Sequence, residues 1–370
     1  MKKVILCCGM LLSFLLPLFG EVGASAYMTG EVWGTNGFLL NNQEQKDDDS
    51  LTVWVNGKRA GMYFRVWAYP LENNKDNLLR LRSIKVWFKP IDVVTVSVGN
   101  VGSYLYTEQL DWWQTPAGAS YAQYQAWDTR WSNYAGYEGG GVGVELSPME
   151  NLYLAFGITP GFGTRFMQEG ELISNDLRYG AVVKYSFPGI GSVGASFRDD
   201  GFGEGTSEIP HEQKIAKFGF DVSAIEGMYG FLQFVFRFDT SASAWGTSDD
   251  PLALQGISLD PYFSYSFEDF SLQAHIPLTF RLTGGSDDPS YMTFDVKVSY
   301  ALSTYIPYVR IQQQGDVPLL FNEDFAFEPQ YNIGVEWGFD ANSWFDVSLQ
   351  IENVEGKISW CIPFSARAGF

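Results

Sequence analysis

Hydrophobic and polar residues alternate with a period of two along most of this chain. The alternation is clearest in residues 152–158, 232–238, 272–280, 292–298, 333–337, 345–351 and 358–370. Successive side chains of a β-strand point to opposite faces of the sheet. The pattern therefore predicts strands with one apolar face and one face that carries small, polar and charged residues.

The final segment shows this pattern in its strictest form. Residues at every second position form one set, which we call a parity. The apolar parity consists of Ile358, Trp360, Ile362, Phe364, Ala366, Ala368 and Phe370. The other parity consists of Ser359, Cys361, Pro363, Ser365, Arg367 and Gly369. The chain thus ends on a predicted strand whose last residue is aromatic.

Short and long connections alternate between the predicted strands. The short ones lie at 56–58, 89–92, 147–151, 188–189, 226–227, 268–269, 303 and 340–343. The long ones lie at 34–50, 70–78, 100–138, 160–175, 199–213, 240–254, 283–290 and 314–328. We count eighteen strands, with sixteen as an alternative and fourteen possible if the loops are longer. The alternation changes phase within residues 80–86, which indicates either a β-bulge or a misplaced strand boundary.

The N-terminus has the features of an export signal. Lys2 and Lys3 precede an apolar run from Val4 to Phe19, and Ala24-Ser25-Ala26 fits the small-x-small cleavage rule. The apolar run is shorter than the ~20 residues that a spanning helix needs. We therefore predict a signal peptide at 1–26 and a single domain at 27–370. Only Cys361 would remain in that domain, which excludes an internal disulfide and argues against a cysteine metal site.

With its export signal, its alternating strands and its terminal Phe370, the chain resembles bacterial outer-membrane β-barrel proteins of the porin type. The resemblance implies an all-β transmembrane antiparallel barrel with short periplasmic turns and long external loops. It also implies an outer-membrane location, contact with lipid, and recognition of Phe370 by the barrel assembly machinery. A homotrimer is compatible with this class. The alternative, a soluble β-sandwich, shares the alternation but not the other features.

A barrel places the charged parity of each strand in its interior, which makes those residues candidates for lining a pore. From residue 139 onward the basic ones are Arg178, Lys184, Arg198, Lys217, Arg237, Arg281, Lys297, Arg310 and Arg367. The acidic ones are Glu145, Asp221, Asp239, Asp260, Asp295, Glu336, Asp346 and Glu352. Nine bases against eight acids are nearly balanced. They could form a transverse field across a constriction or pair with one another along a wet wall.

The excess acid lies in the long connections. Net charge is −19, and loss of two lysines and one glutamate with the signal makes it −20, which argues against nucleic acid as a partner. Residues 199–213 and 314–328 contain acids and neither Lys nor Arg. A channel mouth lined by these acidic connections would enrich cations, most strongly at low salt. Carboxylates there could take divalent ions, although none has the spacing of a dedicated calcium loop.

The longest connection, residues 100–138, is rich in aromatic side chains. Its candidate constriction or ligand residues are Trp112, Trp113, Tyr124, Trp127 and Trp131. So much apolar surface is expected to be buried somewhere. The loop could fold into the lumen, form a sugar or apolar-ligand site, or pack on itself or at the membrane surface.

Catalysis is not expected. His275 has no evident Ser or Asp partner in register, and His211 lacks a second motif. No cofactor-binding motif or metal pair is present in the sequence. The leading hypothesis is passive diffusion of small hydrophilic solutes through a porin. The alternatives are a channel selective for sugars or hydrophobic molecules, and a surface adhesin or structural barrel with ligand-binding loops.

Overall fold

The chain forms one continuous antiparallel β-sheet in a computed structural model. The structure describes residues 21–34, 50–68, 79–99, 141–160, 177–204, 210–239, 254–282, 291–292, 294–313, 317–318, 329–340, 343–354 and 356–369. Every regular element in these ranges is a strand. No helix in the described part of the chain is long and apolar enough to cross a membrane.

The strands follow one another closely in sequence. The first half contains β1 (Glu21–Gly34), β2 (Ser50–Asn56), β3 (Ala60–Ala68), β4 (Leu79–Ile91), β5 (Val94–Gly99), β6 (Gly141–Met149), β7 (Leu152–Pro160), β8 (Leu177–Phe187), β9 (Gly191–Glu204) and β10 (Pro210–Val222). The second half contains β11 (Met228–Asp239), β12 (Leu254–Phe267), β13 (Phe270–His275), β14 (Leu278–Arg281), β15 (Tyr291–Met292), β16 (Asp295–Tyr300), β17 (Tyr305–Gln313), β18 (Val317–Pro318), β19 (Pro329–Asp340), β20 (Ser343–Val354) and β21 (Lys357–Gly369).

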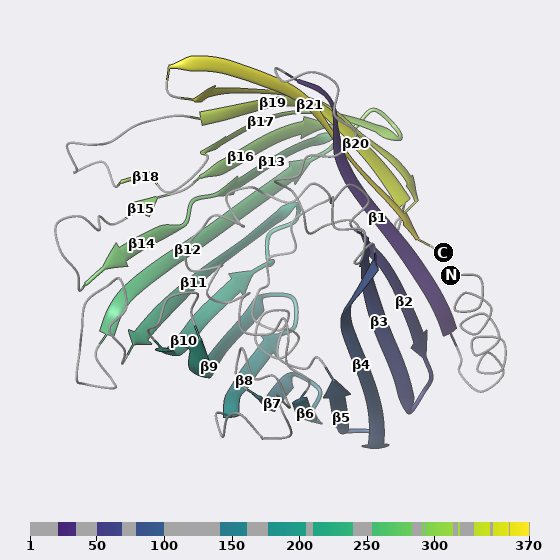
Figure 1. Ribbon diagram of the computed structural model, residues 1–370, viewed down its shortest axis with the longest axis vertical. Coiled ribbons are helices and arrows are strands. Elements are labelled where there is room, and N and C mark those ends of the chain that lie inside the picture. Colours follow the sequence, from purple (N-terminus) through teal and green to yellow (C-terminus); the bar gives the residue numbers. More distant parts are fainter. Residues whose placement is uncertain are drawn as a thin grey trace.

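The sheet closes into a barrel because β1 pairs with β2 on one edge and with β21 on the other. Figure 1 shows β1 lying between these two strands. Three strands are interrupted: β13 and β14 both face β12, β15 continues β16, and β18 continues β17. The 21 segments therefore make 18 strands, which confirms the predicted number and the all-β barrel.

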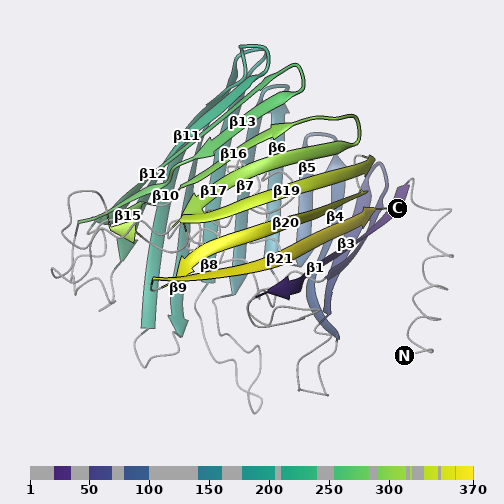
Figure 2. The same cartoon turned by 90° about the horizontal axis from the view of Figure 1, so that it is seen from above.

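Tight turns join the strands at one end of the barrel. Gly227 has a φ of 74°, and a Cβ there would lie 2.1 Å from the carbonyl oxygen of Ser266. Only glycine fits such a turn without strain. Glu268 and Ser303 also adopt positive φ, at two positions that the sequence predicts as turns. Seen from above, the strands run obliquely around a common interior (Figure 2).

The phase change at residues 80–86 corresponds to a real irregularity. The register between β3 and β4 shifts between Arg65 and Val66, because Arg65 faces Ser83 while Val66 faces Leu81. The additional residue in β4 is Arg82. Of the two alternatives, the bulge is confirmed, and it explains why apolar residues change parity within this strand.

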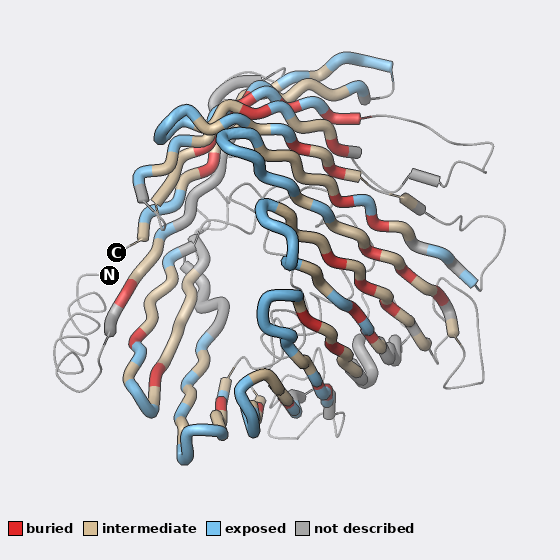
Figure 3. The backbone as a smooth tube through the Cα atoms, turned by 180° about the vertical axis from the view of Figure 1, so that it is seen from behind, coloured by how far each residue is buried: buried red, intermediate tan, exposed pale blue. Residues whose placement is uncertain are grey.

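Burial is inverted relative to a water-soluble sandwich. In β19, Ile333 and Phe339 are each 57% exposed, whereas Gln330 is 1% exposed and Asn332 6%. Figure 3 shows the same alternation of buried and exposed residues along many strands. The apolar parity forms the outer face and the polar parity forms the inner face of the barrel. An apolar outer face is what a lipid environment requires.

Candidate functional site: the inner face of the barrel

Polar and charged side chains are concentrated on the inner face, which we define as the polar parity of the strands. This face contains most of the buried polar residues, including Lys217, Gln233, Asp260, Asp295 and Lys297. The register brings them together because antiparallel pairing places inner residues of adjacent strands opposite one another. His275, for example, faces Asp295, which in turn faces Gln312. Burying charges in this way is costly unless they are paired.

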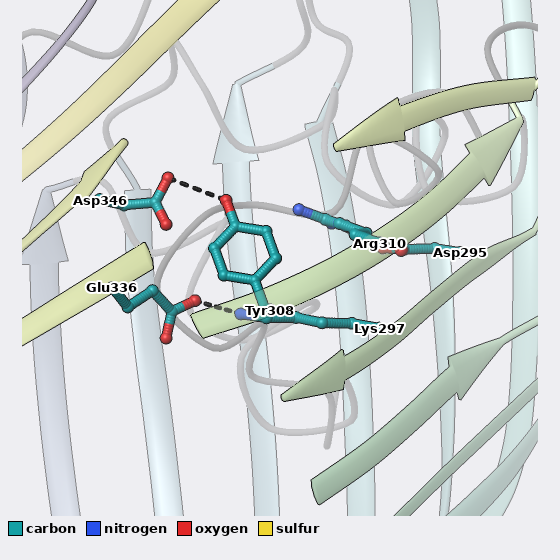
Figure 4. A network of polar contacts seen from close by, with 6 residues as sticks. All are labelled: Asp295, Lys297, Tyr308, Arg310, Glu336 and Asp346. Carbon is teal, nitrogen blue, oxygen red and sulfur yellow. Dashed lines mark hydrogen bonds and ion pairs between the residues drawn. The ribbon is translucent and has the colours of Figure 1, made fainter. Parts of the chain in front are cut away.

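A network on β16, β17, β19 and β20 provides such pairing (Figure 4). The Arg310 guanidinium donates two hydrogen bonds to the Asp295 carboxylate, from Nε at 2.8 Å and from a terminal nitrogen at 2.6 Å. Lys297 forms an ion pair with Glu336, which lies beyond β17 on β19. The Lys297 ammonium also lies 4.3 Å from the centre of the Tyr308 ring. The ring face contributes a favourable cation–π contact to this lysine.

Tyr308 links this network to β20. Its hydroxyl donates a hydrogen bond to Oδ1 of Asp346 at 3.2 Å. The other oxygen, Oδ2 of Asp346, is buried without a hydrogen-bond partner. Glu336 lies directly opposite Asp346 in the sheet, so two carboxylates are neighbours here. Tyr308 fits this position because Gly334 faces it and leaves room for its ring.

Two further contacts extend the polar wall on either side. His275 Nε2 contacts the Asp260 carboxylate on the adjacent strand. Gln312 donates an amide hydrogen bond to Gln330 at 2.6 Å. The expectation that His275 lacks an acidic partner in register is wrong, because Asp295 lies directly opposite it on β16 and Asp260 contacts it diagonally from β12. Asp260 lies two residues before Tyr262, the residue opposite His275, and a diagonal contact of this kind is invisible in the sequence alone.

Inner charges on other described strands also make contacts. Lys85 on β4 lies 3.7 Å from Glu145 on β6. Asp221 accepts a hydrogen bond from the Ser192 backbone amide at 3.0 Å and contacts the hydroxyl of the same residue. These pairs again join neighbouring or next-neighbouring strands. In the described strands, these contacts of inner charges therefore join near neighbours along the wall.

The candidate pore-lining residues can now be placed. Asp260, Asp295, Lys297, Arg310, Glu336 and Asp346 lie on the inner face and belong to the contacts above. Asp221 contacts Ser192, and Lys184 faces Gly194 on β9. Arg178, Arg198, Arg237 and Arg281 occupy inner register positions opposite Thr159, Gly180, Ile215 and Gly256, and their side chains lie outside the description.

Several predicted residues lie outside the described ranges. They are the constriction or ligand candidates Trp112, Trp113, Tyr124, Trp127 and Trp131, with the whole of the 100–138 loop, and the assembly residue Phe370. Their roles stay predictions.

The sequence reading missed the aromatic part of the inner face. Trp54 packs over Gly23 and Trp87 packs over Gly61, in each case across a strand pair. Phe231 on β11 stacks against Tyr262 on β12, with ring centroids 5.4 Å apart. The parity of the neighbouring charges could have placed these aromatics inside. Trp87 in particular shares its parity with Lys85 rather than with the apolar Val86.

Among the described residues, no group of three or more His, Cys, Asp or Glu side chains is arranged to hold a metal ion. The inner face offers instead hydroxyls, amides and paired charges. These groups form hydrogen bonds with water and with polar solutes. The arrangement therefore creates a hydrophilic surface inside an apolar shell.

Comparison with solved structures shows the same fold. The Salmonella typhi OmpF complex with daunomycin is 13% identical with a TM-score of 0.51, over 95% of this chain and 97% of that one. Acinetobacter baumannii OccAB4 is 9% identical with a TM-score of 0.51, over 94% and 97%. Pseudomonas aeruginosa OccK1 is 7% identical with a TM-score of 0.50, over 94% and 97%. No protein-family profile matches the chain, and no curated protein matches it in sequence.

These likenesses define a class by fold. The chain is a porin-like, closed β-barrel of eighteen antiparallel strands. Identities of 7–13% carry the likeness no further than the fold.

Proposed function

We propose that this protein is an outer-membrane channel for the passive diffusion of small hydrophilic solutes. The observation that supports this most is the inversion of its surfaces. Large apolar side chains are exposed on the outside, while Asp260, Asp295 and Lys297 are buried on the inside. A lipid-facing shell around a polar interior suits a membrane channel better than a soluble binding protein.

The strand number supports an aqueous interior. Side chains fill a barrel of about eight strands, whereas barrels of about 16–18 strands leave an aqueous channel. Under this proposal, solutes are selected by size at a constriction, to which the 100–138 loop contributes. Charged groups that are already paired along the wall bind each solute weakly, and weak binding permits exit as well as entry.

The proposal includes the cellular context. The barrel resides in the outer membrane after export by a cleaved signal peptide, and Phe370 presents the last strand to the barrel assembly machinery. A homotrimer is compatible with it. The fold is the basis for this placement, because an apolar band on a closed barrel is stable in a bilayer.

Single-channel recording in a planar bilayer tests the central claim. Refolded protein should produce stable open steps, and a salt gradient should give the sign of ion selectivity. Oligosaccharide that blocks current would identify a sugar-selective channel instead. If a barrel that migrates as folded on SDS gels gives no conductance, passive diffusion is refuted and a closed barrel with adhesive loops becomes the better hypothesis.

Cys361 offers a sharper test of where the solute passes. It lies on β21 at the inner position opposite Gln350, and no other cysteine follows the signal peptide. A charged methanethiosulfonate reagent should lower the conductance of the unmodified protein and leave Cys361→Ser unchanged. In the Cys361→Ser background, Ser359→Cys should restore the effect, because residue 359 shares the inner parity. Trp360→Cys faces outward and should not respond; equal labelling at 359 and 360 would contradict the assigned faces.

A further inference from the structure

The strand that closes the barrel uses its two halves for two different partners. Ser25 to Gly34 of β1 pair with β21, from Ser25 opposite Gly369 to Gly34 opposite Cys361. Glu21 to Tyr27 pair with β2, from Glu21 opposite Asn56 to Tyr27 opposite Ser50. Figure 1 shows β1 between these neighbours. The first half of β1 therefore forms the backbone pairing with β2, which we call the β1–β2 seam.

Cleavage after Ala26, the bond that the small-x-small rule selects, would remove most of that seam. Of the seven β1–β2 pairs, only Tyr27 opposite Ser50 would remain. β2 consists of seven residues, and all seven pair with β1. Its edge would lose its ladder at membrane depth, where unpaired backbone groups find no water. An open edge is incompatible with a lipid-exposed barrel.

Length leads to the same conclusion. Residues 27–34 make an eight-residue strand, whereas a tilted membrane-spanning strand needs about 9–11 residues. The full β1 has 14 residues. Only the longer strand meets this requirement with a margin.

Side-chain packing also matches residues 21–26 to the barrel. A Cβ built on Gly23 would lie 2.3 Å from the Trp54 ring, so the ring occupies the space that glycine leaves. Gly23 and Ser25 take inner register positions, opposite Trp54 and Thr52. Ala24 and Ala26 take the outer positions, opposite Val53 and Leu51. The segment thus continues the two-faced pattern of the mature strands.

We propose that the mature chain begins at Glu21, and that residues Glu21–Ala26 are the closing half of β1. The signal peptide is then removed by a signal peptidase that hydrolyses the Gly20–Glu21 bond. Water adds across the C–N bond, which leaves a carboxylate on Gly20 and an α-amino group on Glu21. Gly20 supplies the small residue before the bond, and Pro17 interrupts the apolar run shortly upstream. Leu18 is larger than the corresponding Ala24 of the other motif, so the cleavage rule favours Ala26 and the fold favours Gly20.

The direct test is the mass of the mature protein. The full chain is expressed in a Gram-negative host, purified from the outer membrane, and analysed by intact mass and by its N-terminal peptide. We expect the sequence to start Glu21-Val22-Gly23. A folded outer-membrane protein that starts at Ser25 or Tyr27 would overturn the proposal. Neither result depends on conductance, so this test is separate from that of the channel.

Two matched variants locate the scissile bond. A large residue just before the bond blocks signal cleavage, so Gly20→Leu should abolish the Glu21 start. Ala26→Leu should leave both the start and the folded barrel unchanged, because residue 26 is exposed on the outer face. Precursor accumulation in Ala26→Leu and normal processing in Gly20→Leu would refute the assignment.

A stability measurement checks the structural half of the proposal. Gly23→Val should lower the urea midpoint of the assembled barrel, because the added side chain meets the Trp54 ring. Trp54→Ala should remove that penalty in the double variant, which distinguishes a specific clash from a general failure to fold. If residue 23 leaves with the signal peptide, Gly23→Val has no effect on the assembled barrel and the proposal fails.

Discussion

The ion pair between Asp295 and Arg310 should be among the most sensitive points of the inner face. Two hydrogen bonds of 2.8 and 2.6 Å join the groups, whose side chains are only 9% and 12% exposed. Asp295→Asn removes the negative charge and leaves the guanidinium buried without it. Breaking a buried pair from one side costs about 3–5 kcal/mol, because the remaining charge is uncompensated. We expect Asp295→Asn to destabilise the barrel by an amount in this range.

An exposed pair on the same molecule gives the matched control. Arg59 and Asp92 lie 3.3 Å apart near two neighbouring turns, with side chains 65% and 90% exposed. Such a pair contributes only about 0–1 kcal/mol, since water solvates either charge when the other is lost. Asp92→Asn should therefore have little effect. The chemical change is the same in the two aspartate variants. The difference between their costs in unfolding free energy therefore measures the effect of burial.

The assay is urea unfolding of the barrel refolded in lipid vesicles, followed by tryptophan fluorescence and by the gel shift of the folded form. Asp295→Asn, Arg310→Met and the double variant, together with the unmodified protein, form a double-mutant cycle. The double variant should be less destabilised than the sum of the single ones by about 0.5–3 kcal/mol, as expected for contacting residues. Additive single effects, or an Asp295→Asn cost equal to that of Asp92→Asn, would refute the reasoning.

Three other substitutions test separate features by the same unfolding assay. Tyr308→Phe removes the hydrogen bond that the buried Asp346 carboxylate accepts from the hydroxyl and should cost about 1–3 kcal/mol, whereas no loss would show that water replaces the hydroxyl. Gly61→Val should cost about 1–3 kcal/mol, because its first added atom would lie 2.5 Å from the Trp87 ring, and Trp87→Ala should suppress that cost. Val335→Arg, on the exposed outer face, should cost about 2–4 kcal/mol in vesicles, and a neutral result would contradict the lipid-facing assignment.

The fold could be predicted from the sequence because its two strongest signals are local. Alternation in segments such as 345–351 requires only that neighbouring side chains point to opposite faces. The number of strands follows from counting these segments and their turns. The breaks within three strands were not predicted, and at β13 and β14 the cause is local: Pro277, which has no amide hydrogen, stands between them.

The partners of the inner charges could not be predicted in the same way. Parity places Lys297 and Glu336 on the same face, but their contact spans β17 and depends on register between strands far apart in sequence. The choice between a transverse field and pairing along the wall needed that register. For the pairs that the structure describes, the answer is pairing along the wall.

Pairing along the wall also connects the stability of the barrel to the proposed diffusion of solutes. A lone buried charge would attract its counterion strongly and hold it, and a tight site slows passage. Because Arg310 already neutralises and hydrogen-bonds Asp295, the wall stays hydrophilic without binding any one ion tightly. The contacts that hold β16 and β17 together thus favour an unselective interior. Most acids of the predicted connection 199–213 lie instead at the ends of β9 and β10. Under the proposed function, ion preference then depends more on these acidic strand ends and on the other acidic connections than on the paired wall, and it weakens as salt screens them.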